Sequence, residues 1–459
     1  MDIPAWHILI IGLGRSGQAA AELAAAQRAA VTVLDSGSGP ELEKRAQDLR
    51  GRGIEVFTGF GQENWTGPVD LAVISPGISH NSSLGRLAAK LPCPVISELE
   101  YGYLHCACPI IAITGTNGKT TTTELVTHCL KQAGFRVMAS GNIGKPLVKA
   151  ARESAGLDFM VVEASSFQLE RCPSFAPLAA TCLNVTPDHL DRHGTMAEYF
   201  RVKMSLFQHQ RRPKHIVVRR DIQADPLFRE CLGDKADGVA VFTAANDPTT
   251  DFFFDGQWLC HRDADGTVHR FLERAKFRLL GHHNVENALV AAALCRAVGV
   301  APEAIAAGMA SFLPSPHRLE VVAFKKQVLY VNDSKATNLD AAEQAIRSVA
   351  DAVPGKILLI AGGLDKGIEF SPLIPVLKDH VKAVFLIGKC RETLAALWGQ
   401  TVPCRIFASL EAAAEAAMEM AQAGDAVLLA PGCASMDMFR DYAERGEVFT
   451  NHIRRRLGE

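Results

Sequence analysis

The sequence predicts an α/β protein of three consecutive domains. We expect an N-terminal Rossmann-like domain, a central P-loop-type ATPase domain and a C-terminal Rossmann-like domain with a doubly wound sheet. Three observations predict this class: apolar strands end repeatedly in glycine-rich or polar turns, helical patterns follow these strands, and 459 residues suffice for roughly three domains. The expected domains span residues 1–98, 99–314 and 315–459.

The composition is that of an ordinary globular chain, with 21% charged residues and a net charge of −2. The chain therefore has no excess of positive charge that would attract nucleic acid or a membrane surface. No segment has the apolar length of a membrane span, and no basic region precedes the first apolar run. The 12 cysteines include no C-x-x-C pair, so thiols in a reducing compartment are expected. These features predict a cytoplasmic monomer that binds small molecules.

The first strand, in residues 6–12, leads into a glycine-rich turn and an alanine-rich helix; the glycines are Gly12, Gly14 and Gly17. Asp35 closes the next strand, at about the separation of the acid that binds ribose in dinucleotide folds. Because such a turn holds any diphosphate at a helix N-terminus, a dinucleotide of a dehydrogenase and a nucleotide sugar both remain open. A further strand, in residues 69–78, ends at Ser75-Pro76-Gly77. These residues are expected to line the same diphosphate-binding site.

The central domain begins with "IAITGTNGKTTTTELV", residues 111–126, an apolar strand followed by a glycine-lysine turn and threonines. The match to G-x-x-x-x-G-K-[ST] lacks its first glycine, because Ile113 stands there, and Gly115 and Gly118 make the turn instead. Lys119 is suited to the outer phosphates and Thr120 to Mg²⁺. The segment therefore predicts a nucleoside triphosphate site.

Two further strands of this domain end in polar residues. Glu163 ends one of them, where a P-loop enzyme places a Mg²⁺ ligand or a water-positioning acid, although a lone Glu is also commonly structural. His189 follows the other, between Asp188 and Asp191, and as an isolated histidine would be an ordinary surface or core residue. Together with Thr120 these residues favour a metal site.

The rest of the chain is assigned from its turns. Residues 219–280 show short alternating stretches with Asp-Gly turns, which indicate antiparallel hairpins, and the basic run 209–220 indicates a solvated face around an edge strand. Pro314 and Pro316 mark the boundary of the third domain. Its parallel sheet is expected to use strands within residues 328–338, 356–367, 383–389 and 426–437.

Several strings resemble the ordered motifs of the Mur ligase family: "GTNGKTTT", "GNIG", "VVEASSFQLE", "NVTPDHLDRHG", "GHHNVENAL", "PHRLE", "VNDSKATN" and "PGCASMDMF". They cover all three expected domains, and "EASSFQL", "DRHG" and "NDSKATN" are more specific than the phosphate loop. The acceptor motifs are most similar to those of the ligases that add D-glutamate to UDP-N-acetylmuramoyl-L-alanine.

This resemblance implies ATP-dependent amide bond formation through an acyl phosphate, giving ADP and phosphate, in peptidoglycan precursor synthesis. It thereby implies a role in cell wall biogenesis, cell shape and cell division. The first domain would hold the UDP of the substrate, the central domain ATP, and the third domain the amino acid. The resemblance also implies two Mg²⁺ ions.

The resemblance further implies the catalytic residues, which are Lys119, Glu163, His189 and Lys203. Thr120 and Glu163 would bind the first Mg²⁺ and His189 the second. Lys203 would carry a carbamate formed with CO₂, because an unmodified ammonium would be repelled by the two ions. An ordinary lysine on the helix surface is the alternative at this position.

The substrate-binding residues follow from the same resemblance. For ATP they are Gly115, Thr116, Asn117, Gly118, Lys119, Thr120, Thr121, Asn284, Asn287, Arg318 and Asp333. For the UDP-sugar they are Gly14, Arg15, Ser16, Asp35, Ser36, Ser75, Gly77, Asn142, Ser165 and His189. For glutamate they are Lys335, Thr337, Lys366, Tyr442, which stands where many relatives carry Phe, and Ser435, expected at a helix N-terminus.

Alternative functions remain open from the sequence. A sister ligase would add another amino acid, including L-glutamate, or act on folate, since these enzymes share the ATP centre. A non-catalytic nucleotide-binding protein is disfavoured because it would need few of the catalytic residues together. A dehydrogenase is supported by the first glycine-rich turn alone.

Overall fold

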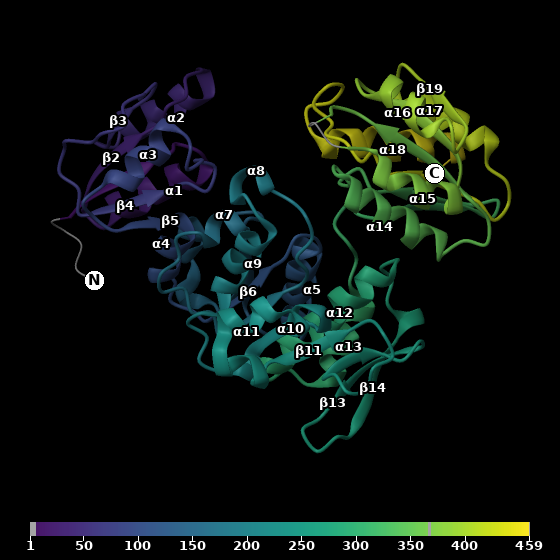
Figure 1. Ribbon diagram of the computed structural model, residues 1–459, viewed down its shortest axis with the longest axis horizontal. Coiled ribbons are helices and arrows are strands. Elements are labelled where there is room, and N and C mark those ends of the chain that lie inside the picture. The colour runs from purple at the N-terminus through teal and green to yellow at the C-terminus, as the bar shows by residue number, and fades with distance from the viewer. Residues whose placement is uncertain (1–5, 366–368, 459) are drawn as a thin grey trace. The chain divides into compact units, whose positions relative to one another are not determined.

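The computed structural model describes residues 6–365 and 369–458. They form an α/β architecture with three separate sheets, which appear in chain order as purple, teal and green in Figure 1. The predicted fold class is confirmed. The chain divides into two compact units, Met1–Lys276 with Asn287–Ser311, and Phe277–Glu286 with Phe312–Glu459. The boundaries proposed for three domains stay a prediction.

The first sheet is wholly parallel and has the order β3-β2-β1-β4-β5, as expected for a Rossmann-like domain. Its strands are β1 (His7–Ile11), β2 (Ala30–Leu34), β3 (Glu55–Phe57), β4 (Leu71–Ile74) and β5 (Val95–Ser97). The helices are α1 (Arg15–Ala26), α2 (Pro40–Arg50), α3 (Ser83–Lys90) and α4 (Glu98–Leu104). Strands β1 and β4 are buried almost throughout, because side chains from both faces pack against helices.

The turn between β1 and α1 requires glycine at Gly17. A Cβ atom there would lie 1.7 Å from the carbonyl oxygen of Gly12, which has a φ of +96°. At Gly14, by contrast, an added Cβ would have no atom within 4 Å, and the backbone is in the extended region. Gly17 therefore lets helix α1 approach the end of β1 closely.

We expect Gly17→Ala to lower the free energy of unfolding by roughly 3 kcal/mol, the upper end for an overpacked site, since backbone must move to admit the methyl group. Gly14→Ala is the matched control and should change stability by less than about 1 kcal/mol. Urea unfolding of both variants measures the difference. Equal stability of the two variants would contradict the close approach.

The second sheet has the order β14-β13-β12-β11-β10-β9-β6-β8-β7. Its strands are β6 (Ile110–Thr114), β7 (Val137–Gly141), β8 (Phe159–Glu163), β9 (Ala179–Cys182), β10 (Ile216–Arg219), β11 (Ala240–Thr243), β12 (Phe252–Phe254), β13 (Trp258–Arg262) and β14 (Val268–Glu273). The helices are α5 (Lys119–Gln132), α6 (Leu147–Ala151), α7 (Ser166–Leu169), α8 (Leu190–His193), α9 (Met196–Met204), α10 (Arg220–Ala224), α11 (Pro226–Leu232), α12 (His282–Ala297) and α13 (Pro302–Ser311). All pairs among strands β6 to β12 are parallel, and β13 pairs in antiparallel fashion with both β12 and β14.

Two local expectations for this sheet are wrong. Antiparallel hairpins occupy only β12 to β14, since α10 and α11 and the parallel strand β11 fill the first part of residues 219–280. Helix α11 starts there because Asp225 accepts the N–H of Leu227 and Pro226 takes the first turn. Strand β10 is not an edge strand, because it pairs with β9 and β11 and its first three residues are buried.

Helix α4 joins the first sheet to the second through a buried carboxyl group. Glu98 is 1% exposed, and its Oε1 accepts the N–H of Val148 in α6 at 2.9 Å. Gly102 allows the close approach of the two helices, since a Cβ there would lie 2.7 Å from the same nitrogen. Burial raises the pKa of Glu98 to about 7, from an ordinary value of 4.5.

This pKa predicts a pH dependence of stability. The unfolded chain releases the Glu98 proton first as pH rises, so the folded state loses stability between about pH 4.5 and 7, by roughly 3 kcal/mol. Glu98→Gln mimics the protonated form, and its stability relative to the native chain should therefore rise between pH 5 and pH 8. Urea unfolding at both pH values measures this. Glu41→Gln, at a side chain that is 92% exposed, should show no such trend.

The third sheet has the order β15-β16-β20-β17-β18-β19, and all of its pairs are parallel except β15 with β16. Its strands are β15 (Glu320–Lys325), β16 (Val328–Asn332), β17 (Ile357–Gly362), β18 (Val381–Ile387), β19 (Cys404–Ile406) and β20 (Ala426–Leu429). The helices are α14 (Leu339–Ala350), α15 (Ile374–His380), α16 (Arg391–Trp398), α17 (Leu410–Met420) and α18 (Tyr442–Leu457). Four strands overlap the four predicted segments, and the edge strands β15 and β19 were not predicted. Among the described residues, no helix has the length and apolar character needed to cross a membrane.

Candidate active site

The predicted phosphate loop lies between β6 and α5, where residues 115–118 turn the chain from strand to helix. Gly115 and Gly118 have φ values of +147° and +83°, which favour glycine. A Cβ at Gly118 would lie 2.5 Å from Oδ1 of Asn287, so this turn also packs against α12. The loop thus has the conformation and the helix N-terminus of an anion-binding turn.

Two lysines converge on one carbonyl oxygen of this loop. The Nζ atoms of Lys119 and Lys203 donate to the oxygen of Gly115 at 2.9 and 2.8 Å, and Lys119 also donates to the oxygen of Thr116 at 2.7 Å. Lys203 is 1% exposed and its Nζ lies 4.5 Å from the centre of the Tyr199 ring. Burial, with Lys119 adding repulsion, lowers the pKa of Lys203 to about 7. Lys203 is therefore a buried amine and not a residue of the helix surface.

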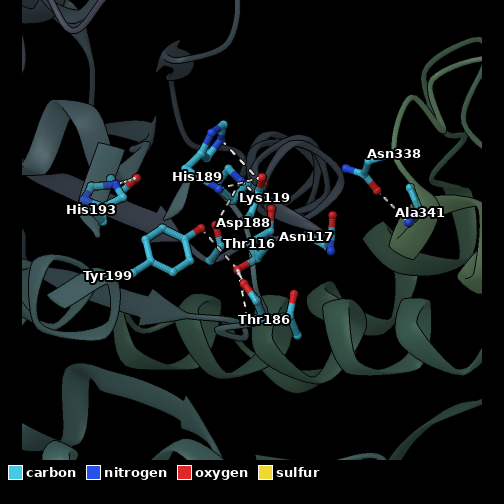
Figure 2. A network of polar contacts seen from close by, with 12 residues as sticks. Thr116, Asn117, Lys119, Thr186, Asp188, His189, His193, Tyr199, Asn338 and Ala341 are labelled. Atoms are coloured by element: carbon cyan, nitrogen blue, oxygen red, sulfur yellow. Dashed lines mark hydrogen bonds and ion pairs between the residues drawn. The ribbon is translucent and has the colours of Figure 1, made fainter. Parts of the chain in front are cut away.

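Sequence reasoning missed two residues that hold the loop. Asn184, just after β9, accepts the N–H groups of Thr116 and Asn117 at 3.0 and 2.8 Å. The Tyr199 hydroxyl lies 3.2 Å from Oγ1 of Thr116, which also accepts the N–H of Thr186 at 3.0 Å (Figure 2). Tyr199 precedes Lys203 by one helical turn, and this i, i+4 spacing was the available signal.

A cavity of about 240 Å³ opens beside these residues. It brings together predicted residues from both sheets of the first unit, namely Gly77, Lys119, Asn142, Ser165, His189 and Lys203. Pro76, Ser166, Phe167, Asp188 and Tyr199 complete its lining. The guanidinium of Arg192 holds the Pro76 side in place by donating to the Pro76 oxygen at 2.8 Å and to both carboxylate oxygens of Glu170. The cavity is thus polar, cationic on one side, and flanked by the Rossmann-like sheet.

The buried carboxyl group of Glu163 bonds to Asn142, which lines this cavity. The Asn142 amide donates to Oε1 of Glu163 at 2.8 Å, and Glu163 is 2% exposed. Its Oε2 has no hydrogen-bond partner among the described residues. A buried carboxylate oxygen without a partner is costly unless a cation completes its surroundings, so the donor set fits a hard oxygen-binding ion such as Mg²⁺.

His189 is held in an unusual backbone conformation at the cavity wall. Its φ is +55°, uncommon for a residue with a side chain, and its N–H bonds to Oδ1 of Asp188 at 2.9 Å. The imidazole Nε2 lies 3.5 Å from the Asp188 carboxylate (Figure 2). The His189 ring lies 4.7 Å from that of Phe167. Such local strain at a cavity lining supports a functional role for this side chain.

The predicted UDP-sugar residues of the first sheet lie around the β1–α1 and β2–α2 turns. Asp35 accepts the N–H groups of Leu13 and Gly37 at 2.6 and 2.7 Å, so it organises both turns as well as offering its carboxylate edge. Ser75 is buried and donates to the Gly12 oxygen, and Arg15 donates to the Gly144 oxygen of the "GNIG" segment. Gly14, Ser16 and Ser36 flank these groups at the N-cap of α1, in its first turn and after β2.

The remaining predicted ATP residues divide between the two units. Thr120 and Thr121 lie in the first turn of α5, and Asn287 accepts the hydroxyl of Thr122 at 3.1 Å, which ties α12 to the phosphate-loop helix. In the second unit, Asn284 donates to the oxygen of Leu280 at 2.8 Å.

Arg318 and Asp333, also in the second unit, lie before β15 and after β16. Arg318 stands between His317 and Leu319, both at positive φ, +67° and +44°. Strained positions on both sides of one arginine favour a functional constraint on its placement.

The predicted glutamate residues lie in the second unit, except that Lys366 is outside the described residues. Lys335 lies over the Tyr442 ring at 3.9 Å, and Thr337 lies between Lys335 and α14 in the chain. Ser435 is buried, but it is not at a helix N-terminus as expected. It begins a turn in which its oxygen accepts the N–H groups of Met438 and Phe439, and α18 starts later, at Tyr442.

All three parts of the chain are similar to domains of one known family. Three family models match the chain: a Mur ligase MurD-like N-terminal domain over residues 6–97, a Mur ligase middle domain over 113–295 and a Mur ligase glutamate ligase domain over 317–433. The chain belongs to the Mur ligase family. The resemblance drawn from the motifs is therefore confirmed.

Individual Mur ligases match it over nearly their whole length. The UDP-N-acetylmuramoylalanine--D-glutamate ligase of Geobacter metallireducens is 36% identical over 98% of this chain and 97% of its own. The protein of the same name from Koribacter versatilis is 38% identical over 99% of this chain and 98% of its own.

Solved structures of the family share the fold at low identity. The UDP-N-acetylmuramate-alanine ligase MurC of Thermotoga maritima has a TM-score of 0.59 at 16% identity, over 99% of this chain and 100% of its own. The MurF ligase of the same organism, in complex with ADP, has a TM-score of 0.58 at 17% identity, over 93% and 96%. These likenesses support the fold of this Mur ligase.

Proposed function

We propose that the chain joins D-glutamate to UDP-N-acetylmuramoyl-L-alanine at the expense of ATP, in peptidoglycan precursor synthesis. The observation that carries this proposal is the cavity in which the phosphate-loop lysine, Lys119, meets Gly77 of the Rossmann-like sheet, with Asn142, His189 and Lys203. Such a cavity suits a nucleoside triphosphate on one side and a nucleotide sugar on the other. The names of the full-length relatives supply the identity of the amino acid and of the acceptor.

The reaction forms an amide in two steps. The substrate carboxylate attacks the γ-phosphorus of ATP, the bond to the β–γ bridging oxygen breaks, and ADP leaves with an acyl phosphate behind. The amine of glutamate then attacks the acyl carbon, and phosphate leaves as the tetrahedral intermediate collapses and the amine loses its proton. Because two anions must approach each other in the first step, cationic groups at the cavity are required.

Residues of this chain would bind the phosphates on one side of the cavity and the UDP-sugar on the other. Lys119 and the N–H groups of the loop bind the phosphates, and Asn142 and Gly77 orient the acceptor end of the UDP-sugar. Thr120 and Glu163 would hold one Mg²⁺, and His189 with Lys203, as a carbamate, would hold a second. When bound, Mg²⁺ supplies charge neutralisation between phosphate and carboxylate.

A carbamate on Lys203 is the finer part of this proposal. It is supported by the burial of the amine, its place in the cavity lining and its competition with Lys119 for the oxygen of Gly115. The ammonium first loses one proton to give the neutral amine, and addition of CO₂ to the Nζ then forms an N–C bond with loss of a second proton, so the cation becomes an anion. This removes the repulsion between the two lysines and creates an oxygen ligand for a cation.

The glutamate site and the ATP contacts of the second unit belong to the same proposal. Lys335, Thr337, Lys366, Ser435 and Tyr442 would bind glutamate, and Asn284, Arg318 and Asp333 would contact ATP. The reaction consumes ATP and a nucleotide sugar, so we place it in the cytoplasm. A monomeric state stays a prediction.

Phosphate release from ATP tests the function directly. The chain is incubated with UDP-N-acetylmuramoyl-L-alanine and D-glutamate, L-glutamate or no amino acid. Release that requires both the UDP-sugar and D-glutamate is the expected result. Release with a different amino acid would assign a sister ligase, and no release under any condition would favour a nucleotide-binding protein without turnover.

A further inference from the structure

The β13–β14 hairpin carries a cluster of metal-ligating side chains that the proposed reaction does not use. The hairpin forms one edge of the second sheet, and strands β12, β11, β10 and β9 separate it from β6 and the phosphate loop (Figure 1). His261 and His269 are directly opposite each other in its register. Residues opposite each other, and residues two apart on one strand, project from the same face of a sheet. Asp263 therefore joins the two histidines on one face.

The three side chains converge closely. One ligand atom from each of His261, Asp263 and His269 lies within 4.8 Å of the other two. The two imidazole rings stack with centroids 4.8 Å apart and an interplanar angle of 13°, and both Nε2 atoms face the Asp263 carboxylate, at 3.6 and 2.9 Å. Two imidazoles and a carboxylate in this disposition are a three-ligand set for a tetrahedral ion with one open position.

The buried member of the cluster has an incomplete environment. His261 is 4% exposed, and among the residues that the structure describes its ring makes no hydrogen bond, since 3.6 Å to Asp263 is too long for one. Its Nε2 therefore remains available to a ligand. A cation between the rings and the carboxylate would complete the coordination of this nitrogen.

The cluster can contract to the distances of a bound ion. Ligand atoms around a tetrahedral Zn²⁺ lie roughly 3.4 Å apart, given bonds of about 2.0–2.1 Å. His269 and Asp263 are 46% and 42% exposed, so their side chains can rotate toward the fixed His261. Arg296 lies 3.7 Å from Asp263, but its side chain is 37% exposed and has room to withdraw into solvent.

We propose that His261, Asp263 and His269 form a binding site for a divalent transition-metal ion of the zinc class, which cross-links the β13–β14 hairpin. Imidazole nitrogen ligands favour zinc, nickel and copper over magnesium, so this site is chemically distinct from the oxygen-rich donor set at the phosphate loop. Its effect is on the stability of the hairpin, since no residue of the cluster lines the cavity described above.

Zn²⁺ titration of the full chain tests the site. Excess Mg²⁺ is kept present so that the oxygen ligands of the phosphate-loop region are occupied, and Co²⁺ serves as a spectroscopic probe, since tetrahedral Co²⁺ absorbs visible light strongly. We expect one equivalent of Zn²⁺ to bind, a tetrahedral Co²⁺ spectrum, and a rise in melting temperature with Zn²⁺.

Three variants decide the assignment. His269→Ala and Asp263→Asn change exposed ligands and should each weaken Zn²⁺ binding at least about tenfold, since even indirect partners of metal ligands contribute that much. His452→Ala is the matched control, because His452 also pairs with a carboxylate, Glu415, beside an arginine, but has no second histidine there. Its affinity should match that of the native chain. Absence of stoichiometric Zn²⁺ binding, or equal affinity in the His269→Ala variant and the native chain, would overturn the proposal.

Discussion

Lys203→Ala is expected to reduce turnover at least about 100-fold, the scale on which a single preorganised charge-stabilising group contributes. The side chain is almost wholly buried at the cavity, and its Nζ donates to the oxygen of Gly115 at 2.8 Å. Alanine removes the proposed carbamate and with it an anionic ligand, while Lys119 still bonds the same oxygen. Phosphate release at saturating ATP, UDP-sugar and D-glutamate measures the loss.

Chemical rescue separates the carbamate from a simple packing role. A short-chain carboxylic acid fits the space that the lysine side chain vacates and supplies a carboxylate, so bicarbonate with such an acid should restore part of the turnover. Lys235→Ala is the matched control, because its Nζ also donates to a carbonyl, that of Gln208 at 2.8 Å, but on the exposed surface. Normal turnover in Lys203→Ala, or an equal loss in both variants, would contradict the assignment.

Lys119→Ala is expected to reduce ATP-dependent turnover by roughly 100- to 1,000-fold. Lys119 is the first residue of α5, and its Nζ folds back over the loop to the oxygens of Gly115 and Thr116. From this position the ammonium group offsets the charge of the outer phosphates as the substrate carboxylate approaches. Initial rates of phosphate release over a range of ATP concentrations measure both kcat and KM.

Two variants make this result specific. Lys119→Arg keeps the charge but replaces a compact ammonium by a planar guanidinium, and it should also lose most of its turnover. Lys131→Ala, in the last turn of the same helix, should retain normal rates. A thermal unfolding midpoint close to that of the native chain would show that the loop variants remain folded. Retention of turnover in Lys119→Ala would remove the phosphate-binding role from this residue.

Much of the fold was accessible from local sequence signals. Buried parallel strands such as β6 and β17 are continuous apolar runs, and the turns after them contain glycines that the backbone requires, as at Gly115 and Gly118. These signals depend on only a few neighbouring residues, so they can be recognised without knowledge of the fold. The edge strands of the sheets were less predictable. Strand β10 lies in a basic run, yet it is an interior strand because β11 pairs with its second side. Pairing partners far along the chain decide such cases.

The sequence by itself determined the class of fold, the phosphate loop, the strand-end residues Glu163 and His189, and the family, because each depends on residues that are adjacent in the chain. Only the tertiary structure decided that Lys203 is buried against the loop, that Asn184 holds the loop N–H groups, and that Ser435 lies in a turn. It alone also placed Gly77 of the first sheet at the cavity beside Lys119 and brought His261, Asp263 and His269 together. These facts depend on contacts between segments distant in sequence or on the strand register, and burial sets which polar groups need partners.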